Sequence, residues 1–381
     1  MSLKLLHLVI PMGVVCSSVI ASATDSYIAQ IATGLADGSS CANARGASYF
    51  NATTNWGAGA TQIGPGTTVH LCGTISTQLT IQGSGSSASP LTVLWEPGAK
   101  ISLPYCDNTN GCIKASGRSW VILNGNGTIP SIENTANGTA LANHQDSVGV
   151  LANGPSCNSC EFKNLTISNL YVYVANSHDP HNFGVTGGFF LGGVSGSDFL
   201  KIHDNICHDV RACLSYNPTA NDSGLQVYNN NFYNADGINI ENNSASTPLI
   251  AATIHDNHFH DIANWDDAGC PYHHDGIHSW GLTGGTNAHI DFYNNLLDGN
   301  FGGCPTGAVF FEGIHTNTRF WNNVFATTFT QEQNGIVNIG SESLQFYNNT
   351  IIGANSSDIC FVAPASVRSG QRRRRCTARR R

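Results

Sequence analysis

An acidic or amide residue followed by Gly and Ile recurs in the second half of the chain, at spacings that would bring carboxyl groups together. The segments are 234–239 with Asp236, 274–278 with Asp275, 311–315 with Glu312, and 334–336. If each Ile points into a shared core, each acid lies at the bend before a strand, and the acids of successive strands form a column. Neighbouring carboxylates repel each other, which raises the pKa of one toward the range of a general acid. Asp236, Asp275 and Glu312 are therefore predicted to catalyse proton transfer.

The expected spacing of these carboxyl groups indicates which reactions they would support. Adjacent strands lie about 4.8 Å apart, so we expect about 5 Å between Asp236 and Asp275 and about 10 Å between Asp236 and Glu312. Two carboxyls about 5 Å apart suit a retaining glycosidase, and a separation of about 6.5 to 9.5 Å suits an inverting one. Another interpretation is a ladder of acids that caps turns or holds calcium without catalysing anything.

Histidines are concentrated around the same segments, at His273, His274, His278 and His315. An imidazole can act near neutral pH as a base, an acid or a hydrogen-bonding group. We predict catalytic roles for His274 and His278, together with Arg211 one coil earlier. The other two histidines, with Asn239, are predicted to bind substrate. Three of the histidines could instead hold zinc or copper, although their spacing follows no standard metal motif.

A long insertion at residues 264–274 carries aromatic and acidic side chains. Those of interest are Trp265, Asp266, Asp267 and Tyr272, and Trp280 follows on the next expected strand. Insertions at one corner of a solenoid usually form the walls of its binding face. The three aromatic residues are therefore predicted to stack against sugar rings, with core packing as the alternative. The two aspartates are predicted metal ligands, and calcium is the ion that they would suit.

The elements that must position these residues are read from a repeat in which a short apolar strand runs into Asn and a further apolar residue. The repeated asparagines are Asn205, Asn231, Asn257, Asn295, Asn323 and Asn349, with spacings of 26, 26, 38, 28 and 26 residues. A period in the twenties is typical of a solenoid whose coils stack on a shared core. Asn suits such a bend because it tolerates left-handed φ and can hydrogen-bond its counterpart in the next coil.

Composition supports an all-β chain with many tight turns. There are 41 glycines in 381 residues, and short apolar runs such as 67–71, 91–95 and 120–123 are separated by Gly, Ser and Pro. No convincing amphipathic helix follows the first 23 residues. We predict a single-domain right-handed parallel β-helix over residues 67–362, and residues 24–66 as an N-terminal cap that covers the open strand edges.

At fold level, residues 67–362 resemble the pectin-lyase-like superfamily of parallel β-helices, which includes polygalacturonases, pectate lyases and uronan epimerases. Within it, Asn-Ala-Asp-Gly-Ile-Asn at 234–239 is similar to a polygalacturonase segment whose Asp is catalytic, which implies a catalytic role for Asp236. The resemblance extends no further, since His274-Asp275 stands where polygalacturonases have an Asp-Asp pair. A shorter run, Asp-Pro-His at 179–181, is similar to one in alginate C5-epimerases.

The two ends of the chain differ from its body. Residues 1–23 combine Lys4, an apolar run and Ala21-Ser22-Ala23, as in a secretory signal peptide. The segment 363–381 contains seven arginines in its last ten residues and is predicted to be an atypical basic tail, either a binding segment or an artefact of gene prediction. Without those seven charges the formal net charge changes from −8 to −15, so we expect neither a nucleic-acid nor a membrane partner.

Cysteines and glycosylation sequons also indicate an extracellular protein. Close cysteine pairs predict disulfides at 106/112, 157/160, 207/213 and 270/304. A zinc half-site at 157/160 is the less favoured alternative, because no second such pair exists. Sequons that suit glycosylation stand at Asn51, Asn126, Asn137, Asn221, Asn242 and Asn355, and those at Asn164 and Asn348 fall in strand patterns.

Together these patterns predict a secreted, monomeric enzyme that degrades polysaccharide by glycoside hydrolysis. One alternative is a polysaccharide lyase or C5-epimerase that uses a His or Arg base, with or without calcium. A second alternative is a non-catalytic carbohydrate-binding or effector β-helix, because a fold alone does not define a function. No nucleotide cofactor is expected, since no glycine-rich phosphate loop precedes a helix.

Overall fold

The structure is a computed structural model. It describes residues 25–59, 61–127, 130–136, 145–155, 157–170, 187–193, 199–218, 223–242, 251–263, 274–281, 286–312, 314–329, 337–340, 343–352, 359–362 and 374–376. The predicted signal peptide and most of the predicted basic tail lie outside them.

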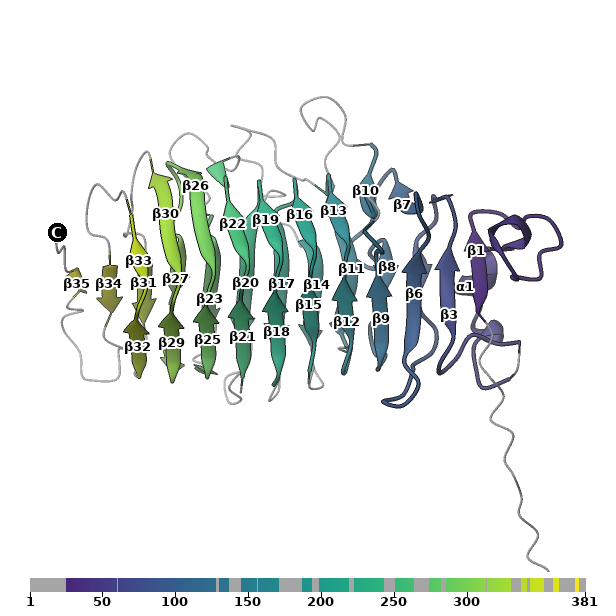
Figure 1. The fold of residues 1–381 in the computed structure, drawn as a ribbon, viewed down its shortest axis with the longest axis horizontal. Helices are drawn as coiled ribbons and strands as arrows, with labels where there is room; N and C mark the ends of the chain where they lie inside the picture. Colours follow the sequence, from purple (N-terminus) through teal and green to yellow (C-terminus); the bar gives the residue numbers. More distant parts are fainter. Residues whose placement is uncertain are drawn as a thin grey trace, which may run out of the picture.

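Three long parallel sheets run the length of the molecule as a right-handed parallel β-helix (Figure 1). The first sheet contains, in spatial order, β2 (Arg45–Gly46), β1 (Ser26–Ala29), β3 (Thr68–Leu71), β6 (Leu91–Trp95), β9 (Val121–Asn124), β12 (Glu161–Lys163), β15 (Lys201–His203), β18 (Leu225–Tyr228), β21 (Ala252–His255), β25 (Ile290–Tyr293), β29 (Thr318–Trp321) and β32 (Leu344–Tyr347). The prediction of an all-β parallel β-helix is confirmed.

The other two sheets complete each coil. The second contains β33 (Thr350–Ile351), β30 (Val324–Phe329), β26 (Leu296–Gly302), β22 (His258–His260), β19 (Asn231–Tyr233), β16 (Ile206–His208), β13 (Thr166–Ser168), β10 (Ile132–Asn134), β7 (Lys100–Leu103) and β4 (Thr74–Ile75). The third contains β35 (Arg374–Cys376), β34 (Ile359–Val362), β31 (Val337–Gly340), β27 (Val309–Phe311), β23 (Ile277–Gly281), β20 (Asp236–Asn242), β17 (Ala212–Pro218), β14 (Gly187–Gly193), β11 (Val148–Gly154), β8 (Ile113–Lys114) and β5 (Leu79–Thr80). A separate pair joins β24 (Thr286–Ala288) and β28 (Ile314–Thr316).

The core is built from apolar side chains that stack in register from coil to coil. On the third sheet Leu214 pairs with Ile238, Ile238 with Ile277, and Ile277 with Val309, and all four side chains are fully buried. Similar columns fill the other two sheets. Because side chains alternate between the two faces of a strand, these columns leave the intervening residues on the outer surface.

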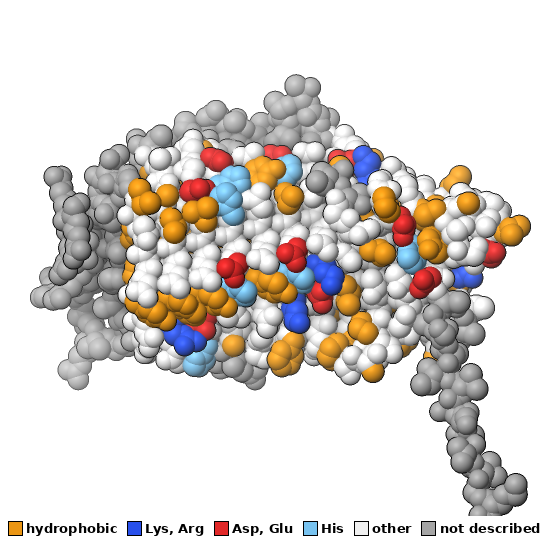
Figure 2. Space-filling view, in the orientation of Figure 1, with side chains coloured by type: hydrophobic (Ala, Val, Ile, Leu, Met, Phe, Trp, Pro, Cys, Tyr) orange, Lys and Arg blue, Asp and Glu red, His pale blue; other side chains and the backbone are white. Residues whose placement is uncertain are grey.

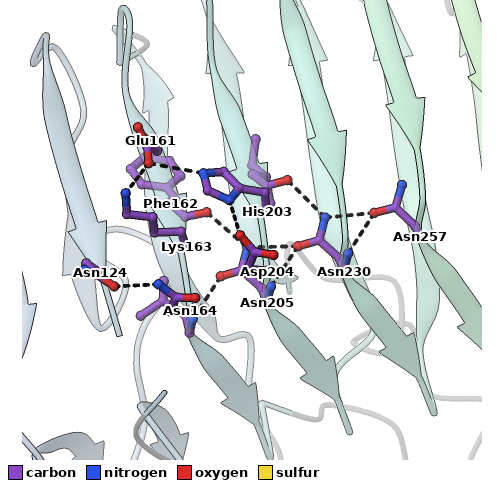
Figure 3. Close-up of polar contacts among 12 residues, drawn as sticks. Asn124, Glu161, Phe162, Lys163, Asn164, His203, Asp204, Asn205, Asn230 and Asn257 are labelled. Atoms are coloured by element: carbon purple, nitrogen blue, oxygen red, sulfur yellow. Dashed lines mark hydrogen bonds and ion pairs between the residues drawn. The ribbon is translucent and has the colours of Figure 1, made fainter. Parts of the chain in front are cut away.

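The recurring asparagine forms a continuous buried ladder along one bend of the solenoid (Figure 3). Each ladder amide donates from Nδ2 to Oδ1 of its counterpart in the next coil, at 3.0, 2.9, 3.0, 3.1 and 2.8 Å, through Asn205, Asn230, Asn257, Asn295, Asn323 and Asn349. The predicted coil-to-coil hydrogen bond is confirmed.

Two details of this ladder differ from the prediction. Its second member is Asn230 and not Asn231, because Asn231 already belongs to β19 and its side chain accepts a hydrogen bond from His260. The left-handed residue is the one before each ladder amide, as at Asn229 and Asp256 with φ of 54° and 55°. The bend therefore needs two specialised positions, one for the backbone turn and one for the ladder.

A second ladder, of stacked rings, lies on the outer face of the first sheet. Its members are His203, Tyr228, His255, Tyr293, Trp321 and Tyr347, with centroids 4.5, 5.1, 4.7, 4.3 and 6.0 Å apart. Figure 2 shows hydrophobic and histidine side chains in a row across this face. Ring stacking between adjacent coils adds to the backbone hydrogen bonds that fix the register.

The N-terminal region extends the first sheet and adds short helices at its end. Strand β1 pairs with β3 and β2, and helix α1 (Ala47–Asn51) buries Phe50 against the first coils, with the short 3₁₀ helices η1 (Cys41–Asn43) and η2 (Thr53–Asn55) on either side. At the other end β35 pairs antiparallel with β34, and Cys360 lies opposite Cys376.

Disulfides connect Cys106 to Cys112, Cys157 to Cys160 and Cys207 to Cys213, which confirms three predicted pairs. Cys304 is also disulfide-bonded, and its predicted partner Cys270 lies outside the described residues. The bond between Cys41 and Cys72 was not predicted, because 31 residues separate the two. Such usage is typical of an oxidising compartment. Within the part of the chain that the structure describes, no helix is long and apolar enough to cross a membrane.

Candidate active site

The outer face of the third sheet brings together most of the predicted site residues that the structure describes. Strand β20 pairs with β23 so that Asn239 lies beside His278 and Glu241 beside Trp280. Strand β23 in turn pairs with β27, with His278 beside Phe310. These residues alternate with the buried isoleucines, so their side chains belong to the outward-facing positions of the sheet.

Asp236 and Asp275 lie on adjacent coils at the bend that leads into this sheet. Ile238 pairs with Ile277, and counting back two residues on both strands brings the two aspartates side by side. The Gly237 amide donates to the Asp275 carbonyl at 3.2 Å, which fixes that register. This register places the two aspartates next to each other, as the sequence predicted.

The glycine between each acid and its isoleucine is required by the close approach of the coils. A Cβ on Gly237 would lie 2.1 Å from the Gly276 carbonyl oxygen and 2.5 Å from the ring of Phe259. No larger residue fits without moving the backbone. The glycine of this Asp-Gly-Ile pattern thus meets a packing requirement between coils.

Each aspartate has a defined hydrogen-bond partner. Asn239 Nδ2 donates to Asp236 Oδ2 at 3.4 Å, and the Gly307 amide donates to Asp275 Oδ1 at 2.8 Å. Asp236 and Asp275 are only 7% and 2% exposed. The hydrogen bond from Gly307 means that one oxygen of Asp275 caps the bend of the next coil, which is the turn-capping role that the sequence offered as an alternative to catalysis.

The predicted position of Glu312 in this column is wrong. Because His278 pairs with Phe310, Glu312 lies in register with Trp280, at the other end of the strands, and its amide donates to the Ser279 carbonyl at 2.9 Å. Strand β28, which begins at Ile314, does not belong to the third sheet and pairs with β24. The acid-Gly-Ile pattern at Glu312 therefore lies at a different position in the coil from the same pattern at Asp236 and Asp275.

The imidazole of His278 is the centre of the described cluster. Its Nδ1 lies 3.9 Å from Asp275 Oδ2, and its Nε2 lies 3.9 Å from Glu312 Oε2. The ring packs 4.2 Å from that of Trp280 and 4.7 Å from that of Phe310. Two carboxyls and two aromatic rings thus hold one partly exposed histidine in place.

The other two described histidines are buried and not on the outer face of the third sheet, contrary to the prediction. His274 is 1% exposed and forms a β-bridge with Pro305. His315 is fully buried, with Nε2 2.9 Å from Ser279 Oγ and its ring 4.9 Å from that of Phe311. Both imidazoles are therefore covered by other protein atoms.

Glu241 also lies in this candidate site, and no sequence motif indicated it. Burial raises the pKa of this carboxyl, while the positive charges of Arg211 and His278 act in the opposite direction. Its Oε2 also accepts a hydrogen bond from Asn217 Nδ2 at 3.4 Å. Alternation along β20 would have identified it, since Glu241 follows Asn239 by two residues on the same face.

Arg211 lies within electrostatic reach of three carboxyls. Burial of the guanidinium lowers the pKa of Arg211, and the charges of Asp236, Glu241 and Asp146 raise it. An arginine stays protonated at any physiological pH. Arg211 therefore brings a permanent positive charge to both Asp236 and Glu241, as its predicted place one coil before Asp236 implied.

Five predicted residues lie outside the described part of the chain: Trp265, Asp266, Asp267, Tyr272 and His273. Among the described residues no group of three or more His, Cys, Asp or Glu side chains could hold a metal ion. The described part of the candidate site contains carboxyls, one imidazole and one guanidinium.

Comparisons with known proteins support the fold. No family model and no curated protein matches this sequence. A crystal structure of a GH136 lacto-N-biosidase from Eubacterium ramulus matches with a TM-score of 0.53 and 12% identity, over 89% of this chain and 67% of that one. An alginate lyase from Paenibacillus sp. aligns at a TM-score of 0.31 and 12% identity, over 87% of this chain and 98% of that one. The chain thus shares the parallel β-helix architecture of the lacto-N-biosidase structure, and its resemblance to the pectin-lyase-like superfamily stays a prediction.

Proposed function

We propose that this protein is a secreted enzyme that cleaves polysaccharide, with its active site on the outer face of the third sheet around β17, β20 and β23. The observation that carries the proposal is the environment of Glu241, because burial raises the pKa of this carboxyl. Arg211 interacts electrostatically with Glu241 and also with Asp236. Hydrolysis of a glycosidic bond uses one carboxyl that donates a proton and a second that acts as base or nucleophile. Glu241 is the candidate proton donor, and Asp236, the other carboxyl on β20 that interacts electrostatically with Arg211, is the candidate base.

In this mechanism Glu241 donates its proton to the glycosidic oxygen of the leaving sugar. Asp236, oriented by the amide of Asn239, acts as the base that activates water. Arg211 stabilises the negative charge that remains when Glu241 has lost its proton. His278 and Trp280 contact the sugar, because they occupy the outward positions beside Asn239 and Glu241.

The fold comparison supports this proposal by analogy. The lacto-N-biosidase that shares the architecture is a glycoside hydrolase, so the parallel β-helix can carry this chemistry. Because one fold can carry many functions, the argument for this chain depends on its own residues. The disulfides and the predicted signal peptide support secretion.

A polysaccharide lyase, or a C5-epimerase that begins with the same proton abstraction, is the second candidate. Arg211 and His278 favour it, since both lie in the carboxyl cluster and β-elimination needs a base beside a group that neutralises a uronate. The non-catalytic alternative makes the opposite prediction about turnover. One set of assays distinguishes all three.

The test uses the purified mature protein on pectin, alginate, glucuronan, xylan and galactan, assayed for reducing ends and for near-ultraviolet absorbance, with and without chelator. We expect reducing ends without absorbance, and a loss of about 10²- to 10⁴-fold in Glu241→Gln and Asp236→Asn. Asp256→Asn is the matched control, because Asn occupies the same left-handed bend in other coils.

Absorbance that accompanies cleavage would replace the hydrolase with a lyase. Turnover that survives in both variants would move the active site elsewhere. A wild-type protein that turns over none of these polysaccharides would favour the carbohydrate-binding or effector alternative.

A further inference from the structure

A cleft on the outer face of the first sheet lies away from the third-sheet site. It has a volume of about 410 Å³, within the range of about 300 to 1,000 Å³ that is typical of ligand sites. Its floor follows one column of outward side chains, in which Ile122 pairs with Glu161, Glu161 with Lys201, and Lys201 with Gln226. Trp120 and Phe199 line its edge, together with Pro90.

Trp120 and Phe199 stand at backbone positions that are unfavourable for large side chains. Their φ angles are 55° and 65°, in the left-handed region, at the bend that precedes β9 and β15. At the corresponding bend of other coils the left-handed residues are Ser159, Gly224, His289 and Asn317. A bulky residue in this conformation costs about 1 to 3 kcal/mol, and such strain tends to be retained where it serves a function.

Neighbouring coils hold both aromatic residues in this conformation. The Trp120 amide donates to the Asn158 carbonyl at 2.9 Å, and its own carbonyl accepts from the Leu91 amide at 3.0 Å. The Phe199 amide donates to the Ser223 carbonyl at 2.9 Å. A Cβ on Gly224 would lie only 2.7 Å from the Phe199 ring. The glycine in the next coil therefore provides the space for the phenyl ring.

Both aromatic side chains are partly exposed to solvent, where small polar residues would avoid the exposure of apolar surface. Trp120 is 37% exposed and Phe199 is 60% exposed. Figure 2 shows hydrophobic side chains along the margin of this face, beside the first-sheet strands. Since β9 and β15 are separated by β12 alone, the two bends are roughly 10 Å apart, twice the strand spacing.

The floor of the cleft offers charged and neutral hydrogen-bonding groups. Glu161 contacts Lys163 and His203 (Figure 3), and although burial raises its pKa, these hydrogen bonds and charges lower it overall. Lys201 donates only, and Gln226 both donates and accepts. Acceptors and donors thus alternate at the strand spacing beneath two exposed rings.

We propose that this cleft is a second carbohydrate-binding site, which holds a pyranose polysaccharide chain apart from the catalytic face. Two aromatic platforms and a floor of donors and acceptors match the apolar ring faces and the hydroxyls of pyranose residues. This proposal rests on the proposed function, because that function identifies the bound polymer as the polysaccharide substrate. A site of this kind would keep the enzyme on its polymer between cleavage events and raise the effective concentration of substrate.

The test is native gel electrophoresis through gels that contain alginate, polygalacturonate, xylan or galactan, with Asp236→Asn in every protein to prevent digestion. Trp120→Asn and Phe199→Asn remove each ring and place a residue that tolerates left-handed φ. We expect about tenfold weaker retardation in each variant, and thermal stability that is unchanged or higher because strain is relieved. His289→Asn, at the equivalent bend outside the cleft, should change neither retardation nor stability.

Retardation equal to that of the parent protein in both aromatic variants would contradict carbohydrate binding in the cleft. The absence of retardation of the parent protein in all four gels would contradict it as well. Equal weakening in His289→Asn would also overturn it. A failure of the proposed catalytic function is seen separately, as cleavage that persists in Asp236→Asn, because that result does not depend on how the gels retard the protein.

Discussion

Glu241 acquires its chemistry from its neighbours and from its depth in the sheet. Burial of the side chain disfavours the carboxylate and raises the pKa above the ordinary value of 4.5. Arg211 and His278 limit that rise, since both favour the charged form. A general acid needs both influences, because it must hold its proton at the working pH and then release it.

The raised pKa of Glu241 predicts how stability depends on pH. The folded protein binds this proton more tightly than the unfolded chain, so ionisation of Glu241 opposes folding. The contribution is fully present below about pH 4.5 and is lost as the pH rises through the folded pKa. We therefore expect Glu241→Gln to melt at a higher temperature than wild type at pH 7 and at the same temperature near pH 4.

Thermal unfolding of both proteins across this pH range measures the effect, and the activity of the wild type should fall over the same range as Glu241 loses its proton. Asp256→Asn serves as the control for removal of an exposed acid. A melting difference that grows toward low pH would contradict the assignment of the raised pKa to Glu241.

At the scale of elements, the asparagine ladder connects one coil to the next. The side-chain oxygen of each internal member accepts a hydrogen bond from a backbone amide of the previous coil, as when Asn230 N–H donates to Asn257 Oδ1 at 3.0 Å. Its side-chain Nδ2 donates to a buried carbonyl, as when Asn230 donates to Ile202. The amides thus satisfy backbone groups that the bend takes out of the sheets. An unsatisfied buried group costs about 1 to 3 kcal/mol.

Asn230→Ala and Asn231→Ala form a matched pair that tests the ladder. Loss of Asn230 leaves the Asn205 amide and the Ile202 carbonyl without this partner, so we expect a destabilisation of about 2 to 6 kcal/mol from two such groups. Loss of Asn231, whose side chain is partly exposed, should cost less than about 1 kcal/mol. Denaturant unfolding compares the two, and equal losses would mean that the ladder contributes little.

At the scale of the whole molecule, a solenoid is most vulnerable at its ends, because terminal coils have a neighbour on one side only. Cys41–Cys72 joins the N-terminal region to the end of β3 across 31 residues. Closing a loop of that length in the unfolded chain is expected to contribute about 3 to 4 kcal/mol.

Removal of this disulfide should therefore lower stability by about that amount. We expect Cys41→Ala, Cys72→Ala and the double variant to lose nearly the same free energy of unfolding, since each single change already breaks the bond. Calorimetry measures all three. A double variant that is much less stable than either single variant would indicate that packing of the cysteines matters more than the crosslink.

The sequence by itself determined the fold class, the bend at which Asn recurs and three of the disulfides, because these depend on local patterns that repeat every coil. It also identified Asp236, Asp275, His278 and Arg211 as members of one cluster. The tertiary structure decided the register. Glu312 and His315 carry the same letters as the other segments, yet the chain leaves the third sheet at β28, so one residue moves to the far end of the strands and the other becomes buried. Glu241 became visible for the same reason, since burial and the charges around a side chain come from neighbouring coils that are distant in sequence.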